Sequence, residues 1–152
     1  MINIKKSPTA DSRTCDFKNV TKSELLNSSM MHILDVKAAV NFFKEKLTEC
    51  AFNHDRDKVT AIDQFHDDFV TNFKNTTWYQ EHKKLNRHHL MDADGIPEDV
   101  NLLDVLEMVA DCTVAGLARS GSVYELKVSN ELLQKALTNT VDMLKSNIRI
   151  VE

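Results

Sequence analysis

Glycine and proline are scarce in this chain, which has three Gly and two Pro among 152 residues. Both residue types are disfavoured inside helices and frequent in turns, so their scarcity disfavours a turn-rich β protein and favours long helices. Apolar residues also recur at helical spacing along much of the sequence. The sequence therefore predicts an all-α fold, and more narrowly a single-domain helical bundle of about five main helices.

The periodic segments set the expected helix boundaries. Residues 1–20 are polar and show no period, so we expect a flexible N-terminal arm followed by a helical domain at residues 21–152. The expected helices cover about residues 23–50, 60–75, 78–90, 97–119 and 129–147. The apolar stripe of the first consists of Leu26, Met30, Ile33, Val36, Val40, Phe43 and Leu47. The buried side of the fourth is expected to consist of Leu103, Leu106, Val109, Ala110 and Val114.

The overall composition argues against several classes of protein. The formal net charge is −4 at pH 7, which makes nucleic-acid binding unlikely because such proteins are more often basic. No apolar run reaches about 18 residues, so we expect no membrane span, and the N-terminus lacks the apolar core of a secretion signal. The three cysteines are too few and too scattered for a disulfide framework or a thiolate zinc site. We therefore expect a cytoplasmic location.

Histidines and aspartates occur in an order that indicates metal binding. In chain order they are His32, His54, Asp55, His82, His88, His89 and Asp111. Imidazole and carboxylate groups are the usual ligands of catalytic divalent metals, and a helical bundle can bring them together from separate helices. A mixed set without thiolate suits Mn, Fe, Zn, Co or Ni better than Mg or Ca.

Helical phase separates the two adjacent histidines. His82, Asn86 and His89 are spaced i, i+4 and i+7, so they share one face of the expected third helix. His88 is turned away from His89 by roughly 100° on such a helix. We therefore expect His89 to bind metal and His88 to lie beside the substrate, unless the helix ends before them.

Carboxylates form a similar stripe on the expected fourth helix. Asp104, Glu107 and Asp111 are spaced i, i+3 and i+7 and would repel one another by roughly a few tenths of a kcal/mol per pair. A nearby cation would remove that cost. A second His-Asp pair, His66-Asp67, lies in mid-helix among polar residues, and we expect it at the surface.

These residues make the chain resemble the HD-domain superfamily of metal-dependent phosphohydrolases, which are helical and are named for an adjacent His-Asp pair. The chain is also similar, over about residues 25–120, to a family of small uncharacterised bacterial and phage proteins. The matching residues are His32, His54-Asp55-Arg56-Asp57-Lys58 with Asp63, Trp78-x3-His82-x3-Asn86-x-His88-His89, and Glu107-Met108-x2-Asp111. Asp57 stands where Ser is more usual.

The resemblance implies a metal centre that holds one or two divalent transition-metal ions. Its ligands would be His32, His54, Asp55, His82, His89 and Asp111. His88 is the alternative to His89 as a ligand.

Four further residues complete the expected site. Lys58 and Glu107 are the candidate catalytic residues, Lys58 as a group that binds a phosphate oxygen. Glu107 would be a general base or the hydrogen-bond partner of a ligating histidine. The candidate substrate-binding residues are Lys58, Asn86, Arg87 and His88.

These features predict an enzyme, a metal-dependent phosphoric ester hydrolase. It would act on a nucleotide or another small anionic phosphoester through a metal-activated water, in the host cytoplasm if the protein is phage-encoded. Homo-oligomer formation is open. Two alternatives also remain open: an HD-type diiron oxygenase, and a non-catalytic protein that binds or sequesters a nucleotide.

Overall fold

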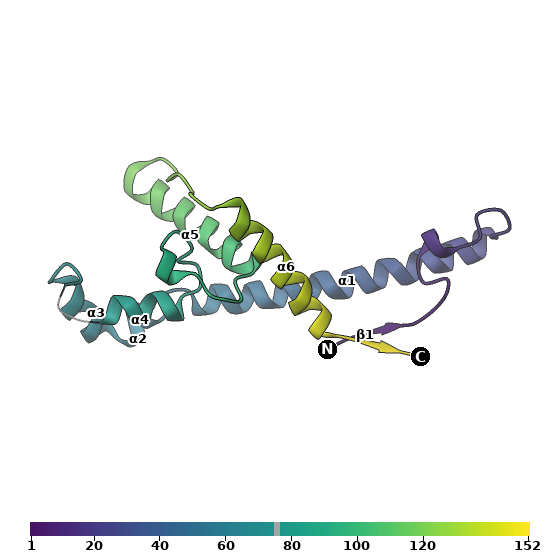
Figure 1. Cartoon of the computed structure of the whole chain (residues 1–152), viewed down its shortest axis with the longest axis horizontal. Helices are drawn as coiled ribbons and strands as arrows, with labels where there is room; N and C mark the ends of the chain where they lie inside the picture. The colour runs from purple at the N-terminus through teal and green to yellow at the C-terminus, as the bar shows by residue number, and fades with distance from the viewer. Residues whose placement is uncertain (75–76) are drawn as a thin grey trace. The chain divides into compact units, whose positions relative to one another are not determined.

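Helices account for most of the chain (Figure 1). The computed structural model describes residues 1–74 and 77–152, and the expected all-α class is confirmed for them. The α-helices are α1 Lys22–Asn53, α2 Asp57–Thr60, α3 Ile62–Phe69, α4 Trp78–Leu85, α5 Leu102–Ser120 and α6 Asn130–Ser146. The other elements are the strands β1 Ile2–Lys5 and β2 Ile148–Val151 and the short 3-10 helices η1 Ser12–Thr14 and η2 Ala93–Gly95. None of the helices in this described part combines the length and apolar character needed to cross a membrane.

The boundaries of α1 and α6 agree with the sequence-based expectation. The boundaries of the helices that lie between these two in the sequence differ from it. The helix expected at residues 60–75 corresponds to α3, which covers only Ile62–Phe69. Thr60 ends the separate short helix α2, because the backbone of Ala61 leaves the helical conformation (φ −121°, ψ 42°). The helix end expected at Asn75 lies outside the described residues. The next helix, α4, stops at Leu85 because Asn86 has an extended backbone (φ −102°, ψ 99°).

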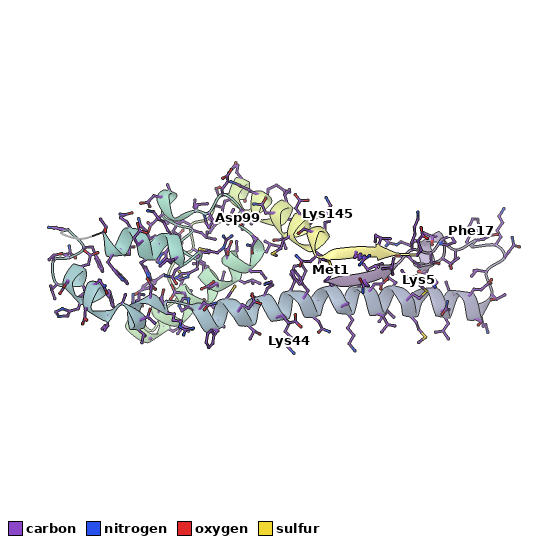
Figure 2. The ribbon with its side chains drawn as sticks, turned by 90° about the horizontal axis from the view of Figure 1, so that it is seen from below. Met1, Lys5, Phe17, Lys44, Asp99 and Lys145 are labelled. Atoms are coloured by element: carbon purple, nitrogen blue, oxygen red, sulfur yellow. The ribbon has the colours of Figure 1, made fainter. Side chains whose placement is uncertain are left out.

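The chain forms two compact units, residues 1–45 with 141–152, and residues 46–140. In the first unit β1 pairs with β2 in parallel, with Ile2 opposite Ile148. Figure 2 labels Met1 and Lys5 at the two ends of β1. The N-terminal residues expected to form a flexible arm thus include a paired strand, while a domain boundary after residue 20 stays a prediction.

The second unit contains the hydrophobic core. Its buried apolar side chains include Leu90, Val100, Met108 and Ala136, which pack together. At the start of α5 the side chains of Asn101 and Asp104 form a capping box. After its end Gly121 adopts a left-handed conformation with φ 70°, which glycine accepts without steric cost. These caps fix the length of the helix that carries Glu107 and Asp111.

The buried side of α5 differs from the expected one. Leu103 is buried as expected, but the other expected members are exposed: Leu106, Val109, Ala110 and Val114. The helix instead turns the side with Asp104 and Met108 inward, because Asp104 pairs with Arg87. Leu106, Ala110 and Val114 help to line an apolar cavity of about 380 Å³ between α5 and the end of α1.

This orientation of α5 makes a testable prediction about stability. Met108 is 2% exposed and Leu106 is 51% exposed on the same helix. Met108→Ala should lower the free energy of unfolding by about 2–5 kcal/mol through lost burial and a new cavity, whereas Leu106→Ala should cost about 1 kcal/mol or less. Urea denaturation followed by circular dichroism compares the two. Equal losses would contradict the orientation of α5.

Candidate metal centre

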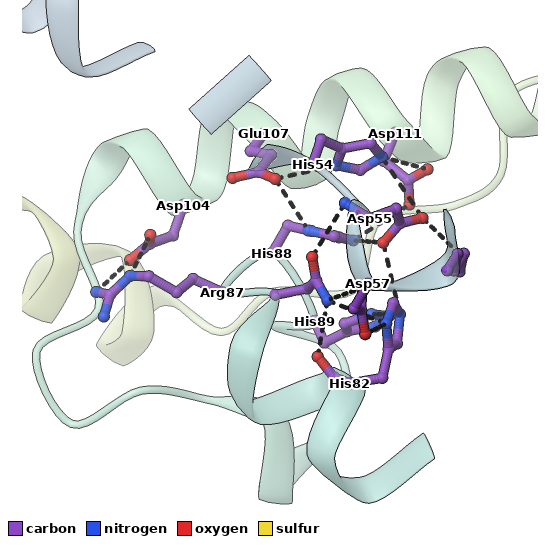
Figure 3. Close-up of polar contacts among 12 residues, drawn as sticks. His54, Asp55, Asp57, His82, Arg87, His88, His89, Asp104, Glu107 and Asp111 are labelled. Atoms are coloured by element: carbon purple, nitrogen blue, oxygen red, sulfur yellow. Dashed lines mark hydrogen bonds and ion pairs between the residues drawn. The ribbon is translucent and has the colours of Figure 1, made fainter. Parts of the chain in front are cut away.

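Residues from four segments of the second unit meet at one cluster of histidines and carboxylates (Figure 3). His54 and Asp55 come from the turn after α1, and His82 comes from α4. The pair His88-His89 follows the end of α4. Helix α5 supplies its carboxylates from the opposite side, as the expected stripe on this helix predicts.

A left-handed turn lets two neighbouring residues face the same centre. Asp55 has φ 50°, a conformation that aspartate accepts more readily than most residues. Its backbone N–H donates to Asn86 Oδ1 at 3.0 Å, which holds the turn in place. Adjacent side chains would point in different directions on a regular helix, so this turn brings His54 and Asp55 together.

Three histidines are oriented by carboxylates. Because a carboxylate only accepts hydrogen bonds, each Nδ1 carries the proton. His54 Nδ1 donates to Glu107 Oε1 at 2.9 Å, and His88 Nδ1 donates to the same oxygen at 3.1 Å. His82 Nδ1 donates to Asp57 Oδ2 at 2.8 Å. In their neutral forms all three rings therefore present an Nε2 lone pair, the arrangement of metal-binding histidines.

The three Nε2 atoms surround the carboxylate of Asp55. Asp55 Oδ1 lies 3.5 Å from His82 Nε2 and 3.6 Å from His88 Nε2, and Oδ2 lies 3.7 Å from His54 Nε2. Oδ1 is buried without a hydrogen-bond partner, whereas Oδ2 accepts from Lys58. Lone pairs that face a buried carboxylate oxygen are unfavourable without a positive charge between them. A divalent cation fits this arrangement.

The ligand atoms form two groups that share Asp55. One is His54, Asp55 and His88, and the other is Asp55, His82 and His89. Within each group one ligand atom per residue lies within 4.8 Å of the others. Asp111 adjoins the first group, with Oδ1 3.7 Å from His54 Nε2. The part of the chain that the structure describes thus has donors for one ion or for two.

Charge in the cluster suits a cation at neutral pH. Burial alone would raise the pKa of Asp55, but the hydrogen bond and charge of Lys58 outweigh it, so the pKa lies below its usual value. Burial also opposes ionisation of Glu107, yet its hydrogen bonds to His88 and His54 hold its pKa low. Burial lowers the pKa of His89 to about 4, which leaves this ring neutral. Ionised carboxylates and neutral imidazoles are the forms that bind metal.

The end of α4 at Leu85 changes the expected roles of His88 and His89. The helical-face argument does not apply beyond this point, and both rings turn into the cluster. His88 is buried and belongs to the first group, so it stands among the candidate ligands, the alternative left open by the sequence; a contact between His88 and a substrate stays a prediction. His89 belongs to the second group, with Nε2 2.9 Å from His82 Nε2.

Asn86 and Arg87 hold the site together through contacts within the protein. The Asn86 amide accepts from the Asp55 N–H and donates to Asp57 Oδ1 at 2.9 Å. Arg87 makes a bidentate ion pair with the buried Asp104, at 2.8 and 2.9 Å, and its hydrogen bond to Asp104 raises its pKa. Both residues also line a cavity of about 250 Å³ together with Glu107, and the substrate contacts expected of them stay a prediction.

Two histidines, His32 and His66, belong to neither group. His32 belongs to the first compact unit, where its Nδ1 lies 3.4 Å from Asp11 Oδ2, and neither group includes it. His66 and Asp67 are exposed on α3, as their polar surroundings in the sequence predict.

Asp57 is the residue that sequence reasoning missed. It was expected only to replace a serine of the family pattern, but it orients His82 and also accepts from Asn86. An acid two residues after a His-Asp pair is the only local signal, and it does not identify the histidine that the acid contacts.

A second cavity, of about 410 Å³, opens beside the cluster. Lys58, His82, His89 and Asp111 line its polar part, and Arg119 adds a second cation. The aromatic lining consists of Phe65, Phe69, Phe73, Trp78, Tyr79 and Tyr124. The cavity therefore combines positive charge, flat apolar surfaces and candidate metal ligands.

Comparisons with known proteins give the chain no relative. It matches no protein-family model, no curated protein and no solved structure.

The role of Asp57 can be tested by metal binding. Asp57→Ala removes the partner of His82 Nδ1 and should weaken binding of Co²⁺ or Mn²⁺ by about 10- to 100-fold. Asp57→Asn keeps an acceptor for His82 and should lose less. Asp67→Ala, an exposed acid on α3, is the matched control. Calorimetric titration of the metal-free full chain measures all three, and equal affinities for Asp57→Ala and Asp67→Ala would exclude the role.

Proposed function

We propose that this chain is a metal-dependent phosphohydrolase of the HD type that acts on a nucleotide or another small phosphoester. The observation that carries the proposal is the half-buried carboxylate of Asp55, which faces three histidine Nε2 atoms and whose buried oxygen Oδ1 has no hydrogen-bond donor. Evidence for the reaction class comes from the second cavity and from the resemblance of the residue pattern.

When bound, divalent transition-metal ions supply positive charge that lowers the pKa of water and neutralises phosphoester oxygens. The chain's own residues determine where this happens. Glu107 fixes the rings of His54 and His88, and Asp57 fixes the ring of His82. Because each side chain is held by a second contact, little reorganisation is needed when a substrate arrives. Glu107 acts in this proposal through the histidines, as a positioning residue.

The cavity beside the cluster supports a phosphorylated substrate with a flat ring. Lys58 donates to Asp55 Oδ2 and also lines this cavity, so its ammonium is within reach of a phosphate oxygen there. Arg119 provides a second positive charge. Aromatic side chains stack favourably on bases, with about 1–3 kcal/mol per stacked base. A nucleotide satisfies both the cationic and the aromatic parts of the lining.

The decisive experiment combines metal analysis with a substrate screen. The purified chain, or the metal-free chain supplied with Mn²⁺ or Co²⁺, should bind the metal and hydrolyse members of a nucleotide and phosphoester panel. Asp55→Asn keeps a residue that tolerates the left-handed turn but removes the charge, so turnover should fall at least about 100-fold with unchanged helicity. His66→Ala should be silent.

Other outcomes identify other functions. Absence of bound metal together with absence of hydrolysis would exclude the proposal. Iron binding with oxygen uptake and no phosphate release would favour an HD-type diiron oxygenase, because the same imidazole and carboxylate donors suit iron. Tight nucleotide binding without turnover would favour a non-catalytic binding protein.

A further inference from the structure

The first compact unit lacks a hydrophobic core. Among residues 1–45 and 141–152, all of them described, Ser28 is the only buried residue. The core cluster of the chain lies entirely in residues 46–140. Burial of apolar surface is the dominant favourable term in folding. The apolar side chains of this unit therefore lack the cover that a stable unit requires.

Helix α1 has two opposite faces in this unit. The inner face is buried or half-buried and consists of Ser28, Met31, Asp35, Ala38 and Phe42. We call the opposite face the outer stripe; it is exposed and consists of Leu26, Met30, Ile33, Lys37, Val40 and Lys44. Its members alternate by four and three residues, the spacing of a coiled-coil seam. Two large apolar side chains, Met31 and Phe42, thus face inward, whereas four, Leu26, Met30, Ile33 and Val40, face outward.

The outer stripe is large enough to form a stable contact. Leu26, Met30, Ile33 and Val40 are 62%, 53%, 61% and 59% exposed. Leu34 and Val36, beside the stripe, are 61% and 46% exposed. Six side chains of this size present on the order of 600 Å² of apolar surface, against about 800 Å² per partner in a standard protein interface. The aliphatic stems of Lys37 and Lys44 extend this surface.

We propose that the outer stripe packs antiparallel against the outer stripe of a second copy of this chain. A two-fold dimer needs a self-complementary patch, and this alignment provides one. When Lys37 lies beside Ile33 of the second copy, Lys44 lies beside its Leu26 and Met30 lies beside its Val40. Each pair of facing residues across the interface then contains at least one large apolar side chain.

The lysines determine the direction of pairing. A parallel pair in register would place Lys37 beside Lys37 of the second copy and Lys44 beside Lys44 of the second copy. Like charges at such positions repel each other. In the antiparallel pair each lysine stem covers an apolar side chain while the ammonium reaches water. The dimer does not depend on the metal centre, so the two proposals can fail separately.

Light scattering coupled to size-exclusion chromatography tests the dimer with the full chain at micromolar concentration. The mass should be twice that of one chain. Ile33→Glu combined with Val40→Glu should halve this mass, because both positions are exposed in the single chain and each places a charge in the seam. Phe17→Glu is the matched control: Phe17 is 84% exposed in the same unit but lies outside α1 (Figure 2), so this variant should stay dimeric.

Circular dichroism should give equal helicity for the monomeric variant and the control, which separates lost assembly from lost folding. Lys37→Leu, which removes a charge from the seam, should instead make the dimer more resistant to dilution. A wild-type mass of one chain, or an unchanged mass for Ile33→Glu with Val40→Glu, overturns the proposal.

A short amine-reactive crosslinker tests the direction. Lys22 and Lys44 are 22 residues apart in one helix, which separates them by about 33 Å. The crosslinker should therefore join Lys22 to Lys44 only between two antiparallel copies, and a mixture of ¹⁴N- and ¹⁵N-labelled chains identifies such links by mass. Links between Lys22 and Lys22 of the other copy would overturn the antiparallel arrangement.

Discussion

The half-buried carboxylate of Asp55, with its oxygen Oδ1 buried, is the constraint on which the arrangement of the candidate metal centre depends. Removing a carboxylate from water costs several kcal/mol unless other groups compensate. Lys58 compensates at Oδ2, but no protein group donates to Oδ1. In their neutral forms the neighbouring histidines do not donate to Oδ1, because each Nδ1–H donates to Glu107 or Asp57 and the Nε2 atom without a proton lies toward Asp55. A bound cation would compensate the negative charge there.

The residues that hold this geometry lie where helices end. Helix α1 ends at Asn53 and its last turn leads into the left-handed Asp55, and α4 ends at Leu85 directly before Asn86 and Arg87. Asn86 connects the segment after α4 to the turn after α1, because it accepts a hydrogen bond from the Asp55 N–H. Arg87 connects the same segment to α5 through its ion pair with Asp104. Continuous helices would point the same side chains in divergent directions. The helix ends are therefore as important to the centre as the ligands themselves.

The sequence predicted the residue types of the centre better than their geometry. Histidine and aspartate are recognisable by chemistry alone, and the periodicity of apolar residues located α1 and α6 closely. The end of α4 was missed, since no proline or glycine stands at Asn86 and its amide is occupied by residues distant in sequence. Tertiary partners likewise determine the roles of His88, Arg87 and Asp57. No local sequence pattern therefore predicts these roles.

Periodicity also identifies an apolar face without telling what covers it. On α5 the expected face was wrong because an ion pair with Arg87 turns Asp104 and Met108 inward, and Leu106 instead lines a cavity. On α1 the large apolar side chains of the stripe, such as Leu26 and Ile33, point away from the rest of their unit. The inner face of this helix contains Met31 and Phe42 beside Ser28 and Ala38, while the larger number of its big apolar side chains stays uncovered. The dimer proposed above would cover them, because a second α1 offers large apolar side chains at the same heptad spacing.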